Sequence, residues 1–150
     1  MHDPWQETPV ESWEFFDKSM EQFKPRECLF RGQADSTWNL RTSLDRSFDA
    51  IQNIIFSATG KERVFAKKEH ENFLIKSFQK NANLFLKSSP PSEKKLEWLA
   101  IMQHYGAPTR LLDVTLSPHI ATFFALESGV GDSCVFVIST TTTFRITTTF

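Results

Sequence analysis

Trp98–Glu127 reads WLAIMQHYGAPTRLLDVTLSPHIATFFALE and predicts two helices and a short strand between them, with polar groups in the turns that join these elements. The first helix is expected to end at Gly106, because glycine accepts the left-handed backbone of a C-terminal cap and Pro108 prevents the helix from continuing. The second helix is expected to begin after Ser117, a good N-cap, with Pro118 at the first helical position. Polar groups held between packed elements in this way are typical of binding sites.

The connection between these helices, Arg110–Val114, predicts a short strand. It is apolar after its first residue except for the carboxylate of Asp113. A carboxylate buried without a partner costs several kcal/mol, so Asp113 is expected to be paired or hydrogen-bonded. Its candidate partners are Arg31 and Arg110, either in a structural ion pair or in a functional site.

The rest of the chain predicts both helices and strands. Apolar residues recur at helical spacing in Glu11–Phe23 and Glu62–Leu86, whereas Cys28–Phe30 and Ser133–Ile138 have the composition of strands. Phe48–Ser57 is either a short helix or an irregular segment. Strands and helices that do not alternate regularly favour an α+β fold, with short mixed or antiparallel strands flanked by helices.

The end of the chain has an unusual composition. Thr140–Thr149 contains seven threonines, a residue type that favours strands. This segment is therefore either an edge strand or a frayed, low-complexity tail. The predicted organisation is one domain over residues 1–139, including the N-terminal helix, followed by the threonine-rich segment 140–150.

Composition restricts the class of protein. The 150 residues suit one domain with a real core, and 17 basic residues against 18 acidic ones create no global field that attracts nucleic acid or membrane. The two cysteines lie in apolar contexts and are expected to be buried free thiols. The sequence has no apolar run long enough to span a bilayer and no signal-peptide pattern, which favours a cytoplasmic location.

Three ionisable groups are candidates for chemistry, and each has a structural alternative. Arg31, beside Gly32, either holds a phosphate or carboxylate of a ligand or pairs with an internal carboxylate. His104 is either a catalytic group or a capping or core histidine. We expect Arg31, His104 and Asp113 to converge on one cleft. The histidines and cysteines show no metal-ligand spacing, so no metal site is predicted.

Several motifs resemble a known family. The sequence is similar to the FRG domain of bacterial and phage proteins, which is named for its Phe-Arg-Gly motif. The similarity extends over Trp13–Ile138 in matching order. The motifs that carry it are Phe30-Arg31-Gly32-Gln33, Ser43-Leu44-Asp45-Arg46, Met102–Thr115, the Ser117-Pro118 helix and the Val135–Ile138 strand.

Two of these motifs also resemble arginine-type ADP-ribosyltransferases. Phe30-Arg31-Gly32 is similar to the first motif of those enzymes, and Leu112–Pro118 with the following helix is similar to the second. The resemblance implies an ADP-ribosyltransferase-like fold in which Arg31 holds the diphosphate or ribose of NAD and Gly32 the carboxamide. Asp113 stands where those enzymes have serine, and no glutamate follows Glu127 to supply their third motif.

The resemblance leads to two functional hypotheses. In the first, the chain binds NAD and transfers ADP-ribose to a macromolecular acceptor or to water. In the second, a non-catalytic recognition module binds a nucleotide, a nucleic acid or a peptide in the same cleft. Net charge does not support nucleic acid as the partner. The catalytic candidates are Arg31, His104 and Asp113, and the candidates for NAD binding are Arg31, Gly32, Gln33, Tyr105, Arg110 and Thr115.

Overall fold

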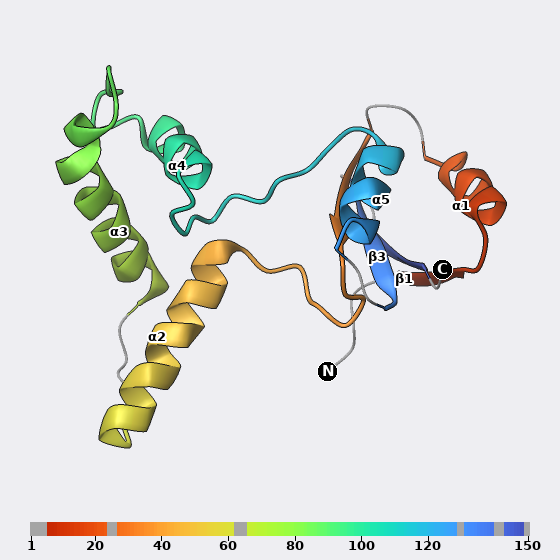
Figure 1. Ribbon diagram of the computed structural model, residues 1–150, viewed down its shortest axis with the longest axis horizontal. Coiled ribbons are helices and arrows are strands. Elements are labelled where there is room, and N and C mark those ends of the chain that lie inside the picture. The colour runs from red at the N-terminus through yellow and green to blue at the C-terminus, as the bar shows by residue number, and fades with distance from the viewer. Residues whose placement is uncertain (1–5, 24–26, 62–65, 129–130, 140–142, 149–150) are drawn as a thin grey trace. The chain divides into compact units, whose positions relative to one another are not determined.

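The computed structural model describes residues 6–23, 27–61, 66–128, 131–139 and 143–148 of the chain. The chain divides into two compact units (Figure 1). The sheet unit comprises Met1–Asn39 and Asp113–Phe150, and the helical unit comprises Leu40–Leu112. Each unit has its own hydrophobic cluster, and their elements confirm the predicted α+β class.

A four-stranded mixed sheet forms the centre of the sheet unit, in the order β1-β4-β3-β2. Strand β3 runs antiparallel to both of its neighbours, whereas β1 runs parallel to β4. Burial of β3 from its first residue to Val137 explains why its sequence is apolar at successive positions instead of alternating. The strands are β1 (Gln6–Val10), β2 (Cys28–Gln33), β3 (Ser133–Ser139) and β4 (Thr143–Thr148).

Two helices, α1 (Trp13–Met20) and α5 (Pro118–Leu126), share one hydrophobic core with the sheet. The predicted Ser117 cap is confirmed, since its side chain accepts a hydrogen bond from Ile120 N at 3.4 Å. At the start of α1, Ser12 accepts one from Phe15 N at 3.2 Å. The core consists of Val10, Phe16, Met20, Cys28, Phe30, Ala121, Ala125, Val135, Val137 and Ile146.

Gly32 allows β2 to approach α5 closely. A Cβ atom at this position would lie 1.9 Å from the carbonyl oxygen of Ala121 and 2.8 Å from the backbone nitrogen of Ala125. Both neighbouring atoms belong to the backbone of α5, so a small side-chain movement cannot relieve the overlap. Gly32 is therefore required for packing between strand and helix.

The helical unit contains α2 (Ser43–Thr59), α3 (Lys67–Asn81), the short 3₁₀ helix η1 (Ala82–Leu84) and α4 (Lys95–His104). Helix α2 is regular and longer than the predicted segment. It begins where Thr42 and Asp45 form a capping box, with Asp45 N donating to Thr42 Oγ1 at 3.1 Å. The helix ends at Gly60, whose φ of 65° is left-handed.

The other two helices of this unit agree in part with the predictions. Residues 62–65 of the predicted helix Glu62–Leu86 lie outside the described residues, and the described helix ends at Asn81. The predicted C-terminal cap of α4 is confirmed, because Gly106 has a left-handed φ of 76°. Helices α3 and α4 pack through a buried cluster of Ile75, Leu99 and Met102.

The predicted strand Arg110–Val114 is wrong. Residues 110–114 carry no strand, and the backbone pairs with β2 through one isolated bridge between Phe30 and Thr115. Leu111 packs against the hydrophobic cluster of the helical unit, whereas Asp113 begins the second segment of the sheet unit. Packing therefore explains Leu111, whereas Val114 is 42% exposed, and the backbone of 110–114 has no neighbouring strand in the described chain.

The threonine-rich segment contributes an interior strand. Within it, β4 pairs with β1 on one side and with β3 on the other. Arg145 is buried, and its Nη1 donates to Glu7 Oε1 at 3.0 Å. Residues 140–142 and 149–150 of the predicted tail lie outside the described residues.

Composition led to expectations about the two cysteines and about membrane-spanning segments. Cys28 and Cys134 are both buried and free, as predicted. Burial raises the pKa of the Cys134 thiol. Among the described residues, every helix is too short or too polar to cross a lipid bilayer.

Candidate functional site

A pocket of about 340 Å³ lies in the sheet unit, next to the edge of β2 that faces away from β3. The Phe30-Arg31-Gly32 strand and the 113–115 segment both contribute to its walls, although they are far apart in the sequence. Apolar side chains make up much of the lining. The lining residues are Phe30, Arg31, Gly32, Asp113, Val114, Thr115, Ala121 and Phe124.

Backbone and side-chain hydrogen bonds attach the 113–115 segment to β2. The backbone of Phe30 donates to Thr115 O at 2.8 Å and accepts from Thr115 N at 2.9 Å. The Arg31 guanidinium donates through Nη1 to the backbone carbonyl of Asp113 at 2.7 Å. Arg31 therefore helps to build the pocket wall as well as lining it.

The pairing of β2 determines the direction of the Gly32 backbone. Because Phe30 bonds to Thr115, its N–H and C=O point away from β3. Backbone groups alternate in direction along an antiparallel strand, so those of Gly32, two residues later, point to the same edge. One donor and one acceptor of Gly32 are thus presented side by side at a position that lines the pocket.

Two further residues of the predicted site lie in this wall. Asp113 is exposed, so the argument that a buried carboxylate requires a partner does not apply to it. Thr115 is partly buried, and its Oγ1 accepts a hydrogen bond from Ser117 N at 3.1 Å. This contact supports the turn that leads into α5, which carries Ala121 and Phe124 of the pocket lining.

The other predicted site residues lie outside this pocket lining. Gln33 is buried at the end of β2. His104 and Tyr105 belong to the helical unit and are exposed at the end of α4. The Tyr105 ring lies 4.9 Å from that of Phe85, with the ring of His104 at 5.5 Å from Tyr105. Arg31 and Asp113 therefore share one pocket, whereas the convergence of His104 on it stays a prediction.

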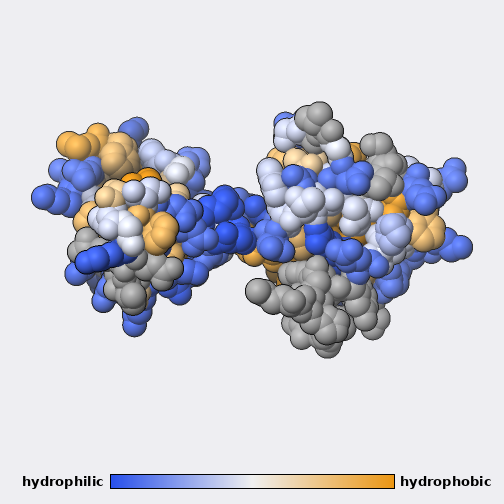
Figure 2. Space-filling view, turned by 90° about the horizontal axis from the view of Figure 1, so that it is seen from below, coloured by the Kyte–Doolittle hydropathy of each residue, from blue (hydrophilic) through white to orange (hydrophobic). Residues whose placement is uncertain are grey.

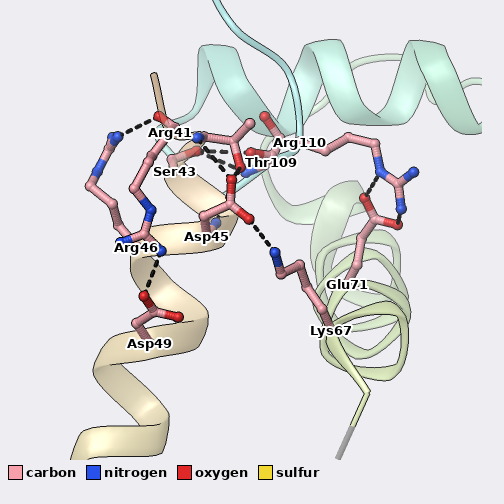
Figure 3. A network of polar contacts seen from close by, with 10 residues as sticks. Arg41, Ser43, Asp45, Arg46, Asp49, Lys67, Glu71, Thr109 and Arg110 are labelled. Atoms are coloured by element: carbon pink, nitrogen blue, oxygen red, sulfur yellow. Dashed lines mark hydrogen bonds and ion pairs between the residues drawn. The ribbon is translucent and has the colours of Figure 1, made fainter. Parts of the chain in front are cut away.

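Arg110 makes a two-pronged ion pair within the helical unit. Its Nε and Nη2 both donate to the carboxylate of Glu71, as Figure 3 shows. Glu71 is fully buried on α3 and also accepts from Lys95 Nζ at 2.8 Å. Both prongs of the Arg110 guanidinium are therefore directed at an internal carboxylate. Arg110, a predicted NAD-binding residue, thus forms a structural ion pair within the helical unit.

Thr109 and Asp45 were not among the predicted site residues, but both take part in the polar contacts of the helical unit (Figure 3). Thr109 is completely buried, and its backbone carbonyl accepts from Leu44 N at 3.0 Å, which joins the residues after α4 to the start of α2. Asp45 accepts from Lys67 Nζ at 2.5 Å. The Lys67 and Thr42 hydrogen bonds lower the pKa of Asp45 to about 2. The Ser43–Arg46 motif was the available signal, whereas nothing in the sequence distinguished Glu71.

Metal chemistry has no visible site in the described part of the chain. No group of three or more histidine, cysteine, aspartate or glutamate side chains there is arranged to hold an ion.

The pocket combines the cation of Arg31, the exposed carboxylate of Asp113 and the backbone N–H and C=O of Gly32 with apolar walls. Such a set suits an organic ligand with a flat apolar part and a polar edge.

The match to a family model decides the identity of the chain. The model of the FRG domain matches residues 26–132, more than half of the sequence. The chain belongs to the FRG domain family. The matched region of this FRG domain contains every residue that lines the pocket, but ends immediately before β3. No curated protein and no solved structure was found to match the chain.

Proposed function

We propose that this FRG domain binds NAD, with the nicotinamide end of the dinucleotide in the pocket beside β2. The observation that carries the proposal is the direction of the Gly32 backbone, which follows from the Phe30–Thr115 pairing. A primary carboxamide has one acceptor and two donors, so it can pair with the N–H and the C=O of one residue simultaneously. Nicotinamide carries such a group on a flat ring.

The walls and the size of the pocket support this choice. Phe30, Val114 and Phe124 supply apolar surface for an aromatic ring. Its volume of about 340 Å³ lies near the lower end of ligand pockets, which span roughly 300–1,000 Å³. We therefore assign the nicotinamide and its ribose to the pocket, and the remainder of NAD to the surface next to it.

Arg31 is the proposed polar anchor for the ribose or the diphosphate. Arg31 lines the pocket, and its guanidinium is oriented by the bond to the Asp113 carbonyl. A guanidinium can direct further N–H groups at phosphate oxygens in a fixed plane, which an ammonium cannot. Thr115 then contributes to the shape of the pocket wall, and Gly32 contributes its backbone N–H and C=O.

ADP-ribose transfer is the proposed chemistry if the bound NAD reacts. The bond between the ribose C1′ and the nicotinamide nitrogen breaks, and its electron pair leaves with nicotinamide. An acceptor oxygen or nitrogen forms the new bond to C1′ and releases its proton to solvent. Asp113 is the lining residue whose negative charge can stabilise the oxocarbenium ion between these events.

Binding without transfer is the second candidate function. The specific observation in its favour is the absence of glutamate from the described residues that line the pocket. In this case the FRG domain recognises a nucleotide, or a nucleotide-like group on a macromolecule, through the same contacts. Release of nicotinamide from NAD distinguishes the two candidates.

The test is calorimetric titration of NAD into the wild-type chain and into Arg31→Lys. Lysine retains the charge but loses the planar donor pair, so we expect a loss of about 1.5–3 kcal/mol, roughly ten- to a hundredfold in affinity. Arg41→Lys is the matched control, because Arg41 pairs with Asp49 in the helical unit. Circular dichroism verifies that both variants are folded.

Two outcomes would contradict the proposal. A wild-type chain that does not bind NAD at millimolar concentration removes its main support. Equal binding by the wild type and Arg31→Lys removes Arg31 from the site. Chromatography of the same incubations for free nicotinamide then separates transfer or hydrolysis from binding alone.

A further inference from the structure

The balanced charge of the chain conceals a strong difference between its two units. The helical unit contains twelve basic and seven acidic residues, whereas the sheet unit contains five basic and eleven acidic ones. The helical unit therefore has five excess positive charges and the sheet unit six excess negative ones. On the face seen in Figure 2, hydrophilic residues of the helical unit are mixed with hydrophobic ones.

Part of the positive charge is arranged along one side of α3. Lys68, Asn72, Lys76 and Lys80 follow one another at intervals of four residues, and all four are exposed. Residues at this spacing form one ridge on a helix. At a rise of about 1.5 Å per residue, the three lysines cover a length of roughly 18 Å.

These lysines differ in their surroundings from three other lysines of the same unit. Lys67, Lys94 and Lys95 each lie within 2.8 Å of a carboxylate oxygen. For Lys68, Lys76 and Lys80, the described residues place no carboxylate within ion-pair distance. We therefore treat these three as the lysine ridge.

One carboxylate and one aromatic ring lie beside the lysine ridge. Glu69 accepts a hydrogen bond from Ala66 N at 3.4 Å, as part of the N-terminal cap of α3. Phe73 is 68% exposed, an unusual exposure for a large apolar side chain in a helix that buries Ile75. The surface therefore combines unneutralised positive charge with an accessible aromatic face.

We infer that the exposed face of α3 binds single-stranded nucleic acid. A linear series of cations matches a chain of phosphates, and the counterions released from those phosphates favour binding. An unpaired base can stack on the accessible ring of Phe73, as occurs on aromatic side chains of proteins that bind single strands. The base stacking favours a single strand over a duplex, whose bases are already stacked.

The experiment measures fluorescence anisotropy of a fluorescein-labelled oligothymidylate of about 20 nucleotides with the full chain. The logarithm of the binding constant falls linearly with log salt, and each phosphate contact on a single strand contributes about 0.7 to the steepness of that fall. Removing three contacts should therefore make the slope shallower by about 2. We expect Lys68→Gln/Lys76→Gln/Lys80→Gln to lose more than tenfold in affinity at low salt.

The matched control removes the same charge from other positions. Lys18→Gln/Lys61→Gln/Lys94→Gln has the same net charge as the ridge variant, and all three control lysines are exposed. We expect the control triple to change affinity by less than about twofold. Phe73→Ala should lower affinity by about fivefold or more and leave the salt slope unchanged, since base stacking is not an ionic contact.

Several results would overturn the inference. If the ridge variant binds with wild-type affinity, the lysine ridge is excluded as the binding surface. Equal losses of affinity in both triple variants show that binding follows net charge alone. Tighter binding to a duplex of the same length, or no effect of Phe73→Ala, excludes the single-strand assignment. Circular dichroism establishes that each variant retains its helices, so a loss of binding cannot result from unfolding.

Discussion

Replacement of Glu71 by glutamine tests the ion-pair network of the helical unit. Glu71 is fully buried, and its two oxygens receive hydrogen bonds from Arg110 and Lys95. Glutamine has nearly the same shape, but it has no charge and replaces one acceptor oxygen with a donor. The substitution therefore removes the ion pairs without creating a cavity.

The surroundings of the two cations determine the magnitude. Breaking a buried ion pair typically costs about 3–5 kcal/mol, because the remaining partner is a buried charge without compensation. The side chains of Arg110 and Lys95 are 53% and 45% exposed, so water can solvate both after the substitution. A hydrogen bond to a charged group contributes about 1.5–3 kcal/mol. We therefore expect Glu71→Gln to lose about 2–3 kcal/mol of unfolding free energy.

The pH dependence of this loss follows from the direction of the pKa shift. Burial alone raises the pKa of Glu71, but the hydrogen bonds from Arg110 and Lys95 outweigh burial and hold the pKa below its ordinary value. A carboxylate with a lowered pKa stabilises the fold above its unfolded pKa, about 4.3 for glutamate. The difference in unfolding free energy between wild type and Glu71→Gln should have its full value at neutral pH. It should shrink as the pH falls through the pKa of Glu71 in the folded chain.

The assay is urea unfolding followed by far-ultraviolet circular dichroism at several pH values. Glu97→Gln is the matched control, because Glu97 forms a pair with Lys94 at 2.8 Å in which both side chains are more than half exposed. An exposed pair at this spacing contributes about 0.5 kcal/mol or less. Equal effects of the two substitutions, or a Glu71→Gln effect that grows as the pH falls, would refute the reasoning.

Two further predictions concern Gly32 and the start of α2. Gly32→Ala should destabilise the fold by about 3 kcal/mol or more, because its Cβ overlaps the Ala121 carbonyl, whereas Gly131→Ala meets no atom within 4 Å and should be nearly neutral. Urea unfolding compares them, and a stable Gly32→Ala would contradict the close packing. Asp45→Asn should lose roughly 1–2.5 kcal/mol near pH 7. That difference should disappear as the pH falls from about 4 towards the Asp45 pKa of about 2, and a loss independent of pH would show that the charge is unimportant.

Local signals in the sequence were sufficient for two helix boundaries. Ser117 and Pro118 begin α5, and Gly106 ends α4, because caps depend on the backbone preferences and side chains of a few neighbouring residues. The composition of Ser133–Ile138 also predicted β3, since β-branched residues fit a buried strand. The FRG motifs were recognisable for a similar reason: each is a continuous run of residues.

The sequence was misleading where the backbone partner is distant. Arg110–Val114 has strand-like residues, but a strand also needs a neighbour, and β2 pairs with this region only at Thr115. The opposite applies to the threonine-rich segment, which gains a partner on each side and becomes an interior strand. Hydrogen bonds between strands far apart in the sequence decide both results.

The candidate site shows the same division between local and distant causes. Sequence motifs selected Phe30-Arg31-Gly32 and the segment around Asp113, but the pairing of Phe30 with Thr115 determines that both line one pocket. The ion pair between Arg110 and the buried Glu71 joins residues 39 positions apart, and no pattern of neighbouring residues encodes it. Caps and strand composition are properties of short segments, whereas the partner of a charge and the direction of a backbone group depend on the tertiary structure.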